Sequence, residues 1–396
     1  MSKPRILLVT NLFPSSAEPT RGIFTLQQMQ DLSEWYDITV VAPYPWTPGW
    51  ARKLLNKGVD VPYHEQVQGF DVYHPRYLVT PKIGRSLYGL FFFLGIFLTL
   101  ARLKKQLSPA FISAHWMYPD AYGAHLAARL LGLPLVTHAL GCDINEFTRF
   151  FWRRHWIGKA LKGSNQVVVV SSQIRDRCVE IGADPARVHV VLNGVDHHKF
   201  QPRDQQQARQ QLKLPPDKKI VLFVGNYNIE KGLSYLVEGF KPLADERDDL
   251  MLCVVGSGPL EAQIRAQIQH LGIGDKIHLA GRVPHEQVPA YLNAADLLCL
   301  PSLREGCPNI ILEALASGTP IVSSRVGAVP DILATIPYRA GILVDPANAS
   351  AITQGLREAL DSDLRLQAPF EWMSWKSSSE QVADVYGMVV TTHPNS

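Results

Sequence analysis

The feature that most constrains the fold is a repeated alternation of short apolar runs with longer segments of helical character. The first run, RILLVT at residues 5–10, precedes an expected helix over residues 23–35. Further runs follow along the chain, at 38–42, 111–114, 135–137, 166–170, 188–191, 220–225, 250–256, 277–279, 297–300, 320–323 and 341–344. Short strands that are apolar along their whole length are typical of parallel sheets covered by helices on both faces.

The alternation lapses once, over residues 197–219, which are polar and hold Pro202, Pro215 and Pro216. We interpret this stretch as a linker that includes a short helix. The sequence therefore predicts two doubly wound, Rossmann-like α/β domains at 1–196 and 220–375, which agrees with a length of 396 residues. Ligands of open parallel sheets bind beyond the carboxyl ends of the strands, so we expect the two domains to face each other across one cleft.

Composition excludes several classes of protein. The chain is 46% hydrophobic and 19% charged, which is typical of a globular protein and excludes a disordered or collagen-like chain. The five cysteines show no paired spacing, which argues against a disulfide framework and against a structural zinc site. We expect a cytoplasmic protein, since the apolar run after the N-terminus is too short for a signal peptide.

Charge is distributed unevenly between the two halves. Residues 1–195 hold 21 Lys and Arg against 13 Asp and Glu, whereas the remaining residues hold 18 against 23. This asymmetry suggests that the first half faces something anionic. The basic residues accompany long apolar runs and no DNA- or RNA-binding motif, so we do not expect a nucleic-acid partner.

Residues 86–101 (SLYGLFFFLGIFLTLA) are uncharged and lie between basic flanks. A helix of this length spans about 24 Å, less than the hydrocarbon core of a bilayer, so a membrane-spanning role is not expected. Two interpretations stay open, a helix buried on the first sheet and a helix lying in a membrane surface. Residues 149–162 mix tryptophans with Arg and Lys, which favours an anionic headgroup layer. Segments 85–105 and 149–162 therefore form a candidate membrane-binding surface.

The most informative stretch for chemistry is residues 301–320, PSLREGCPNIILEALASGTP. Glu305 and Gly306 lie in a loop after a strand, Pro308 and Asn309 mark the start of a helix with Asn309 as its cap, and Glu313 falls in the first turns. A helix N-terminus suits a phosphate, and nearby carboxylates can accept hydrogen bonds from sugar hydroxyls. The alternative is that both carboxylates only stabilise the helix start.

Two further glycine-rich loops follow strands of the second half. In GNYNIEKG, Asn226 and Lys231 lie at the carboxyl edge of the sheet, where the ammonium group could neutralise a leaving phosphate. A solvated lysine is the alternative. The second loop, Gly256-Ser-Gly258, resembles only part of a dinucleotide fingerprint, and we interpret it as a tight turn near a nucleotide.

In the first half, the candidates lie where strands end. Gly22 opens the first helix, and His115, His138 and Asp143 lie at or just after strand ends. A histidine in such a place can hydrogen-bond a sugar hydroxyl or act as an acid or base, or it can be a structural residue. The sequence has no P-loop motif, no HExxH and no Cys/His cluster, so we expect neither a metal nor another cofactor.

Taken together, these segments resemble glycosyltransferase family 4, the retaining enzymes of the GT-B fold. The resemblance covers nearly the whole chain, and the segments that carry it most specifically are EGCPNIILEALASGTPIV, VVLNGVD, FVGNYNIEKG, VVGSGP and GRVPHEQVPAYLNAADLLCLPS. The N-terminal RGIFTLQQMQDL, AHWMYPDAYGA and GCDIN are similar to enzymes of bacterial cell-surface polysaccharides, including the teichuronic acid type. The resemblance also implies that a C-terminal helix within 376–396 crosses back to the first domain.

The resemblance implies roles for individual residues. Glu313 would hold the donor ribose hydroxyls and Glu305 the hydroxyls of the donor sugar. Lys231 would neutralise the diphosphate, and Gly22 would let its loop approach the donor. The backbone N–H groups around the sugar and diphosphate would come from Cys307, Pro308, Asn309 and Ile310. His115 and Asp143 would lie on the acceptor side.

The chain departs from the family pattern at two places. Asn226 stands where the family usually has an arginine, so Lys231 carries more of the electrostatic task. Leu140 stands where the family often has a histidine before the glycine, and His138, two residues earlier, is the candidate replacement.

The resemblance implies a retaining, metal-independent transfer of a sugar from a UDP- or GDP-sugar to a lipid-linked or oligosaccharide acceptor. Together with the candidate membrane-binding surface of segments 85–105 and 149–162, this leads us to expect a cytoplasmic enzyme on the inner face of the cell membrane. Two alternatives stay open. One is a sugar-nucleotide epimerase or hydrolase of the same fold, and the other is a two-domain sugar-binding protein without catalysis.

Overall fold

The computed structural model describes residues 3–46, 61–80, 84–362, 364, 370 and 372–392. The chain forms two compact units. The first unit runs to Leu192 and includes α15 (Trp375–Thr392). The second unit runs from Asn193 to Ser374, so residues 193–196 belong to it and not to the first unit as predicted.

The described part of the first unit contains an eight-stranded sheet of order β10-β9-β8-β7-β1-β2-β5-β4. It is parallel except for the antiparallel pair β4·β5. Its strands are β1 (Arg5–Val9), β2 (Asp37–Val41), β4 (His64–Val67), β5 (Phe70–Tyr73), β7 (Phe111–His115), β8 (Leu135–Ala139), β9 (Gln166–Val169) and β10 (Val188–Val190). A separate parallel pair joins β3 (Tyr44–Trp46) to β6 (Arg76–Leu78).

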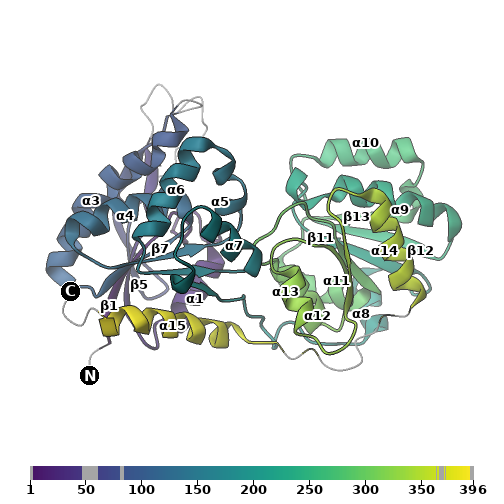
Figure 1. The fold of residues 1–396 in the computed structure, drawn as a ribbon. Helices are drawn as coiled ribbons and strands as arrows, with labels where there is room; N and C mark the ends of the chain where they lie inside the picture. Colours follow the sequence, from purple (N-terminus) through teal and green to yellow (C-terminus); the bar gives the residue numbers. More distant parts are fainter. Residues whose placement is uncertain are drawn as a thin grey trace. The chain divides into compact units, whose positions relative to one another are not determined.

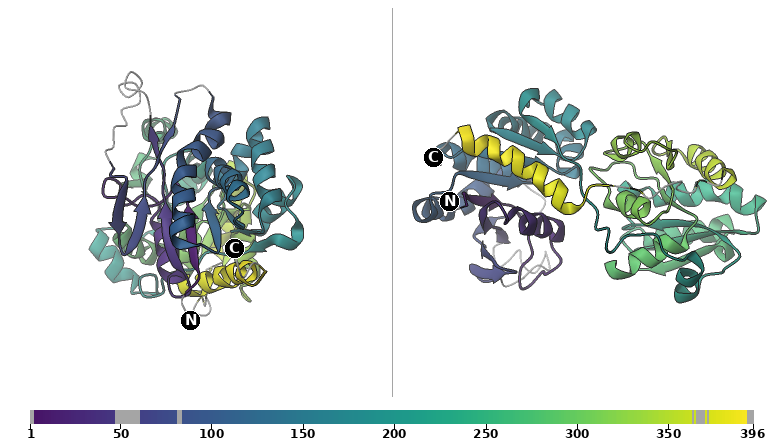
Figure 2. Two further views of the ribbon diagram at one scale, coloured as in Figure 1. Left: turned by 90° about the vertical axis from the view of Figure 1, so that its left-hand side faces the viewer. Right: turned by 90° about the horizontal axis from the view of Figure 1, so that it is seen from below.

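Helices cover both faces of this sheet (Figure 1). One face carries α3 (Tyr88–Leu107), α4 (Tyr122–Leu131), α5 (Cys142–Asn145), α6 (Phe151–Gly163) and α7 (Ser172–Glu180). The other face carries α1 (Ile23–Leu32) and the C-terminal α15, which lie side by side (Figure 2). The final helix therefore completes the core of the first unit, although it follows the second unit in sequence.

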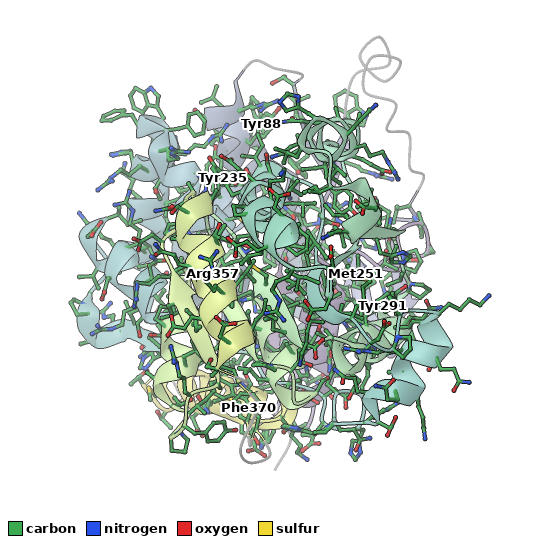
Figure 3. All side chains as sticks on the ribbon, turned by 90° about the vertical axis from the view of Figure 1, so that its right-hand side faces the viewer. Tyr88, Tyr235, Met251, Tyr291, Arg357 and Phe370 are labelled. Carbon is green, nitrogen blue, oxygen red and sulfur yellow. The ribbon has the colours of Figure 1, made fainter. Side chains whose placement is uncertain are left out.

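The second unit contains a parallel sheet of order β13-β12-β11-β14-β15-β16 among its described residues. Its strands are β11 (Lys219–Val224), β12 (Leu250–Val255), β13 (Ile277–Gly281), β14 (Leu297–Leu300), β15 (Ile321–Ser324) and β16 (Gly341–Val344). One face packs against α9 (Leu233–Glu246), α10 (Glu261–Leu271) and α14 (Ala349–Asp361). Arg357, which Figure 3 labels, lies on α14. Its guanidinium pairs with Glu246 of the neighbouring α9. The remaining helices are α8 (Gln205–Leu212), α11 (Val288–Ala294), α12 (Asn309–Ala316) and α13 (Val329–Ala334).

The stretch 197–219 contains the short helix that was expected there, α8, but it is packed in the second unit and is not a free linker. Within it, α8 packs against α11, and the Arg209 guanidinium of α8 donates to Asp296 at 2.8 Å and to the carbonyl oxygen of Ala294 at 2.9 Å. The Arg209 side chain is only 4% exposed. An arginine can be buried in this way because its donors are paired, so the polar appearance of the stretch concealed a packed element.

The predicted alternation of strands and helices is confirmed. Each apolar run became a strand within two residues of its expected ends. The inner strands among them are buried on both sheet faces, whereas the edge strands β10, β13 and β16 are only partly buried. The strands β3 to β6 were not predicted. They are three or four residues long, and β4 and β5 alternate between more and less exposed positions, which leaves no continuous apolar run.

The apolar helix is longer than its uncharged part, because α3 continues through Lys104 and Lys105 to Leu107. By length and composition alone the helical stretch Arg85–Leu107 could cross a membrane, so the expected helix length of about 24 Å was too short. Phe92, Ile96 and Leu100 of this helix are fully buried in the core of the first unit. One side of the helix is therefore part of the core, as the first interpretation has it, and the other side is exposed. The interpretation as a membrane-surface helix stays a prediction.

Candidate functional site

The carboxyl edge of the second sheet reverses its strand order between β11 and β14. Both strands pair with each other, while β12 lies on the far side of β11 and β15 on the far side of β14. In doubly wound folds the loops that leave such a pair of strands diverge and bound a crevice in which ligands bind. The loops here are residues 225–232 after β11 and residues 301–308 after β14.

Lys231 and Glu305 meet between these two loops. The Lys231 Nζ donates to Glu305 Oε1 at 2.7 Å, and the Ser302 hydroxyl donates to the same oxygen at 2.6 Å. Their side chains are 25% and 11% exposed, so the pair is partly shielded from water. A shielded ion pair keeps more of its Coulomb energy than one on the surface. The structure thus brings together two residues that lie 74 positions apart in the sequence.

The two loops that carry Lys231 and Glu305 can approach this closely only because residue 232 is a glycine. It has φ +66°, and a Cβ atom there would lie 2.1 Å from the Pro301 carbonyl oxygen. The predicted tight turn at Gly256 and Gly258 is also a packing device. A Cβ on Gly256 would lie 1.9 Å from the Gly225 carbonyl oxygen, and Gly258 abuts the backbone of Tyr227. The glycines therefore allow three loops of this edge to pack backbone against backbone.

Helix α12 begins at Asn309, with Pro308 at the N-cap position and no side-chain cap. The prediction of Asn309 as the cap was wrong, because its Oδ1 accepts from Asn193 Nδ2 at 2.7 Å. Pro308 has no N–H to donate, so the predicted set of amides reduces to Cys307, Asn309 and Ile310. Gly306 is fixed by the next turn, since its carbonyl oxygen accepts from the Ala328 N–H at 2.8 Å.

Glu313 lies one helical turn after Asn309 and is 10% exposed. Its Oε1 lies 3.1 Å from His285 Nε2, and His285 Nδ1 lies 2.7 Å from Lys199 Nζ. The His285 ring also packs on Phe200, with ring centroids 5.6 Å apart. Sequence reasoning missed His285 and Lys199. The available signal was the place of His285 four residues after β13, at the same sheet edge.

Two other predicted residues flank this edge. Burial raises the pKa of the Cys307 thiol to about 12, so the group stays protonated and is not a nucleophile at neutral pH. Asn226 follows Gly225 directly and is exposed. Its carbonyl oxygen accepts from the Asn228 N–H at 2.9 Å, which tightens the turn that precedes Lys231.

In the first unit, Gly22 serves the local packing of its loop. It precedes α1 with φ +63°, and a Cβ atom would lie 2.2 Å from the Leu12 carbonyl oxygen. A side chain cannot be accommodated there without moving the loop that follows β1.

His115 and His138 are core residues. They are register partners on β7 and β8, their rings stack 3.8 Å apart, and each is 1% exposed. His138 Nε2 lies 2.9 Å from the Tyr386 hydroxyl of α15. Burial lowers the pKa of His115 to about 3, and the pKa of His138 is also well below its ordinary value because of burial. This geometry gives both histidines a packing role in place of the predicted catalytic and acceptor-side roles.

Asp143 holds a loop together. Its buried carboxylate accepts from the backbone N–H groups of Met117 at 2.9 Å, Gly141 at 2.8 Å and Ile144 at 3.1 Å, and also from that of Leu140. Burial raises the pKa of Asp143 to about 6. Its oxygens are occupied by the protein, so the structure does not present them to a sugar.

Sequence reasoning missed Asp120. It is buried and accepts from the Asn11 backbone N–H at 2.9 Å and from Asn11 Nδ2 at 3.0 Å, which links the loop after β7 to the loop after β1. Asp120 follows β7 by five residues, in the segment AHWMYPDAYGA. It lies at neither the end of a predicted strand nor the start of a predicted helix, so no signal in the sequence pointed to it.

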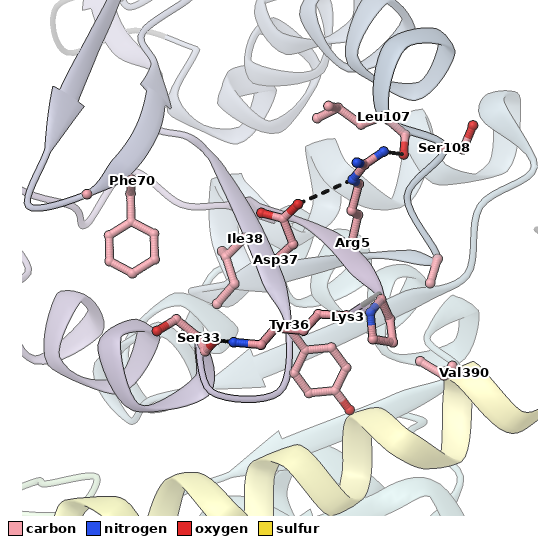
Figure 4. A pocket seen from close by; sticks show the side chains of 13 residues that line it. Lys3, Arg5, Ser33, Tyr36, Asp37, Ile38, Phe70, Leu107, Ser108 and Val390 are labelled. Atoms are coloured by element: carbon pink, nitrogen blue, oxygen red, sulfur yellow. Dashed lines mark hydrogen bonds and ion pairs between the residues drawn. The ribbon is translucent and has the colours of Figure 1, made fainter. Parts of the chain in front are cut away.

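A pocket of about 780 Å³ lies at the opposite edge of the first sheet, around the start of β1 and β2 (Figure 4). Arg5 bridges Asp37 at 3.2 Å and the Leu107 carbonyl oxygen at 3.2 Å, and Lys3 donates to the Ser33 carbonyl oxygen at 2.7 Å. These cations are already paired by the chain, and the pocket is at the amino ends of the strands. It is therefore not at the carboxyl ends of the strands, where ligands of such sheets bind and where the site after β11 and β14 lies.

Among the residues that the structure describes, no group of three or more His, Cys, Asp or Glu side chains is arranged to hold a metal ion. The five cysteines are free thiols.

Two family models match consecutive parts of the chain. The model described as Glycosyltransferase Family 4 matches residues 36–199, and the model described as Glycosyl transferases group 1 matches residues 204–370. The chain is a family 4 glycosyltransferase of the GT-B fold. The two matched regions correspond to its two Rossmann-like units.

This glycosyltransferase is similar to named relatives over most of its length. It is 29% identical over 360 residues to a Bacillus subtilis (strain 168) protein with the provisional name teichuronic acid biosynthesis glycosyltransferase TuaC, covering 89% of this chain and 88% of the relative. It is 30% identical over 284 residues to the MMP alpha-(1->4)-mannosyltransferase of Mycolicibacterium hassiacum, covering 65% of this chain and 66% of the relative.

Solved structures share the fold of this glycosyltransferase. The sucrose-phosphate synthase of Thermosynechococcus elongatus superposes with a TM-score of 0.75 at 20% identity, covering 99% of this chain and 100% of that one. Anabaena HepE, solved in complex with UDP and glucose, superposes with a TM-score of 0.70 at 17% identity, covering 98% and 100%.

Proposed function

We propose that this glycosyltransferase transfers a sugar from a nucleoside diphosphate sugar to a hydroxyl group of a lipid-linked or oligosaccharide acceptor, with retention at the anomeric carbon and without a metal ion. The observation that carries the proposal is the Lys231–Glu305 pair between the loops after β11 and β14. It places a cation and a carboxylate together at the strand reversal of the second sheet.

The donor class is supported by charge and by the structural neighbours. The ammonium of Lys231 and the backbone amides at the start of α12 favour an anionic ligand. HepE was solved with UDP and with UDP-glucose. We propose a UDP- or GDP-sugar as donor, and the relative named for teichuronic acid biosynthesis supports a role in bacterial surface polysaccharides.

In the proposed reaction, the bond between the anomeric carbon and the diphosphate oxygen breaks as the acceptor oxygen bonds to the same face of that carbon. The leaving phosphate takes the proton of the acceptor hydroxyl. Lys231 stabilises the charge that develops on the diphosphate, and Glu305 exchanges its ion pair for the hydroxyls of the donor sugar. Glu313 holds the ribose hydroxyls.

The test is the kinetics of two variants with one matched control. We expect Lys231→Ala and Glu305→Ala each to lower kcat/KM at least about a hundredfold, the effect of removing one electrostatic stabiliser. Lys241→Ala, which removes a half-buried lysine paired with Asp245 on α9, should leave activity unchanged. Near-normal turnover in either site variant would refute the assignment.

The same assay tests the finer points of the proposal. NMR of the product gives the anomeric configuration, and activity in EDTA tests metal independence. Product formed only with acceptor present distinguishes transfer from donor hydrolysis or epimerisation.

We further propose that the enzyme works on the inner face of the cell membrane through α3 and the start of α6. Leu87, Leu90, Leu94 and Leu98 form one exposed line at helical spacing, with Leu98 76% exposed. The line continues into exposed Arg102 and Lys105. A helix with one buried apolar side, a second apolar side in solvent and basic ends suits an anionic lipid surface.

An aromatic cluster at the start of α6 extends this surface. Phe150, Phe151 and Trp152 are all more than half exposed. Tyr122 of α4 joins the two helices, because it stacks on Trp156 of α6 at 5.1 Å and lies against Gly89 of α3. Exposed Trp and Phe beside basic residues are typical of the membrane interface.

Flotation with phosphatidylcholine vesicles, with and without phosphatidylglycerol, tests the attachment. We expect binding that increases with the anionic lipid and that falls at least about tenfold in Leu94→Ser/Leu98→Ser, since each leucine contributes on the order of 1 kcal/mol of apolar burial. Met388→Ser on α15 removes an equally apolar exposed side chain elsewhere and should bind as the unmodified protein does. Unchanged flotation of the double variant would contradict the proposal. So would a dimer of the unmodified protein that the double variant no longer forms, because the leucines would then contact a second copy of the chain.

A further inference from the structure

Glu313 is oriented by one side chain. In the described part of the chain, His285 is the hydrogen-bond partner of its carboxylate, through Oε1 at 3.1 Å. The other oxygen, Oε2, has no partner among the described residues. A carboxylate that is 10% exposed and held at one oxygen presents the second oxygen in a defined direction.

The tautomer of His285 follows from its second contact. Lys199 Nζ lies 2.7 Å from Nδ1, and an ammonium group can only donate hydrogen bonds. Nδ1 must therefore accept, which places the ring proton on Nε2, where it points to Glu313. Contact with Phe200 limits the ring on one side. Lys199, His285 and Glu313 thus form a directed chain in which each member fixes the next.

We propose that His285 is a positioning residue for donor recognition, which sets the Glu313 carboxylate to accept hydrogen bonds from the ribose hydroxyls. The inference rests on the proposed function, because it assigns the ribose to Glu313. It adds a requirement for His285 and Lys199, which belong to the loop after β13 and to the segment that precedes α8.

The experiment compares the binding of UDP and 2′,3′-dideoxy-UDP by calorimetry, with the GDP and ADP pairs measured in parallel. The unmodified enzyme should prefer the ribonucleotide. We expect His285→Ala to weaken ribonucleotide binding about tenfold and to leave binding of the dideoxy analogue nearly unchanged, since one hydrogen-bonding arrangement is lost. His285→Gln keeps an amide donor and should restore most of the preference. Lys199→Met should reduce the preference to an intermediate value.

The outcomes separate this inference from the proposed function. Equal loss of affinity for both nucleotides in His285→Ala would overturn it and would point to a contact with the base or the phosphates. Unchanged preference in His285→Ala would overturn it as well. If the unmodified enzyme binds no nucleotide of the panel, the proposed donor class itself is wrong. Thermal denaturation of each variant shows whether it is folded.

Discussion

At the scale of single residues, burial decides which ionisable groups can serve catalysis. Lys231 and Glu305 are partly shielded but reach the carboxyl edge of their sheet. His138 and Asp143 lie in a comparable place in the sequence, just at or after a strand, yet they are fully enclosed. The enclosed groups are paired with Tyr386 and with backbone amides, which is the usual condition for a buried polar group.

Asp143 gives a prediction for stability against pH. Its pKa in the folded state, about 6, is above the ordinary value of 3.8, so the native state binds this proton more tightly than the unfolded state. The contribution to stability is therefore complete below pH 4 and is lost as the pH rises through 6. It amounts to about 3 kcal/mol at most.

Urea unfolding between pH 4 and 7.5 checks this. Asp143→Asn cannot titrate, so the difference in unfolding free energy between the unmodified protein and this variant should shrink as the pH rises. A difference that is constant over this range would contradict the raised pKa.

At the scale of elements, the site depends on how closely the loops at the sheet edge approach one another. The loop after β11 meets the Pro301 carbonyl at Gly232 and the turn after β12 at Gly225. The Leu303 N–H also donates to the Glu230 carbonyl oxygen at 2.7 Å. These backbone contacts restrict the distance between Lys231 and Glu305, because Lys231 lies between Glu230 and Gly232 and Glu305 lies two residues after Leu303.

Gly232→Ala tests this dependence. A Cβ atom 2.1 Å from the Pro301 oxygen must displace one loop, and the left-handed φ adds strain. We expect a loss of at least about tenfold in kcat/KM and a destabilisation of about 1–3 kcal/mol. Gly272→Ala is the matched control, since it has nearly the same φ of +67° and no atom within 4 Å of the added Cβ. It should show the strain alone, with unchanged activity.

At the scale of the whole molecule, the chain returns to its first unit after completing the second. The Tyr386 hydroxyl of α15 contacts Ser113 Oγ at 2.6 Å and His138 Nε2 at 2.9 Å. Its ring packs on Tyr36 and Phe111. Residues more than 240 positions apart thus share one core, so the first unit needs the C-terminal helix for its fold.

Tyr386→Phe removes only the hydroxyl group that contacts Ser113 and His138. It keeps the ring and leaves His138 and Ser113 without their shared partner, so we expect a loss of about 1–3 kcal/mol in unfolding free energy. Met388→Ala, at a position 43% exposed on the same helix, should change stability by less than about 0.5 kcal/mol. Equal stability of both variants would show that α15 is held by apolar contacts alone.

The amino-acid sequence was sufficient to predict the strands and the two-unit organisation, and to name Lys231 and Glu305 as candidates, although not their ion pair. Continuous apolar runs such as those of β1 and β11 mark a buried parallel strand locally, and chemical residues that follow such strands meet at one sheet edge. The short, half-exposed strands β3 to β6 carry no such signal.

The contacts between side chains from distant segments could be determined only from the three-dimensional structure. That His138 faces Tyr386, that Asp143 is surrounded by amides and that His285 orients Glu313 are contacts between segments distant in the chain. Local periodicity records which residues are buried, but it does not record their neighbours. Those neighbours are set by how helices and loops pack on the finished sheets, which involves the whole chain at once.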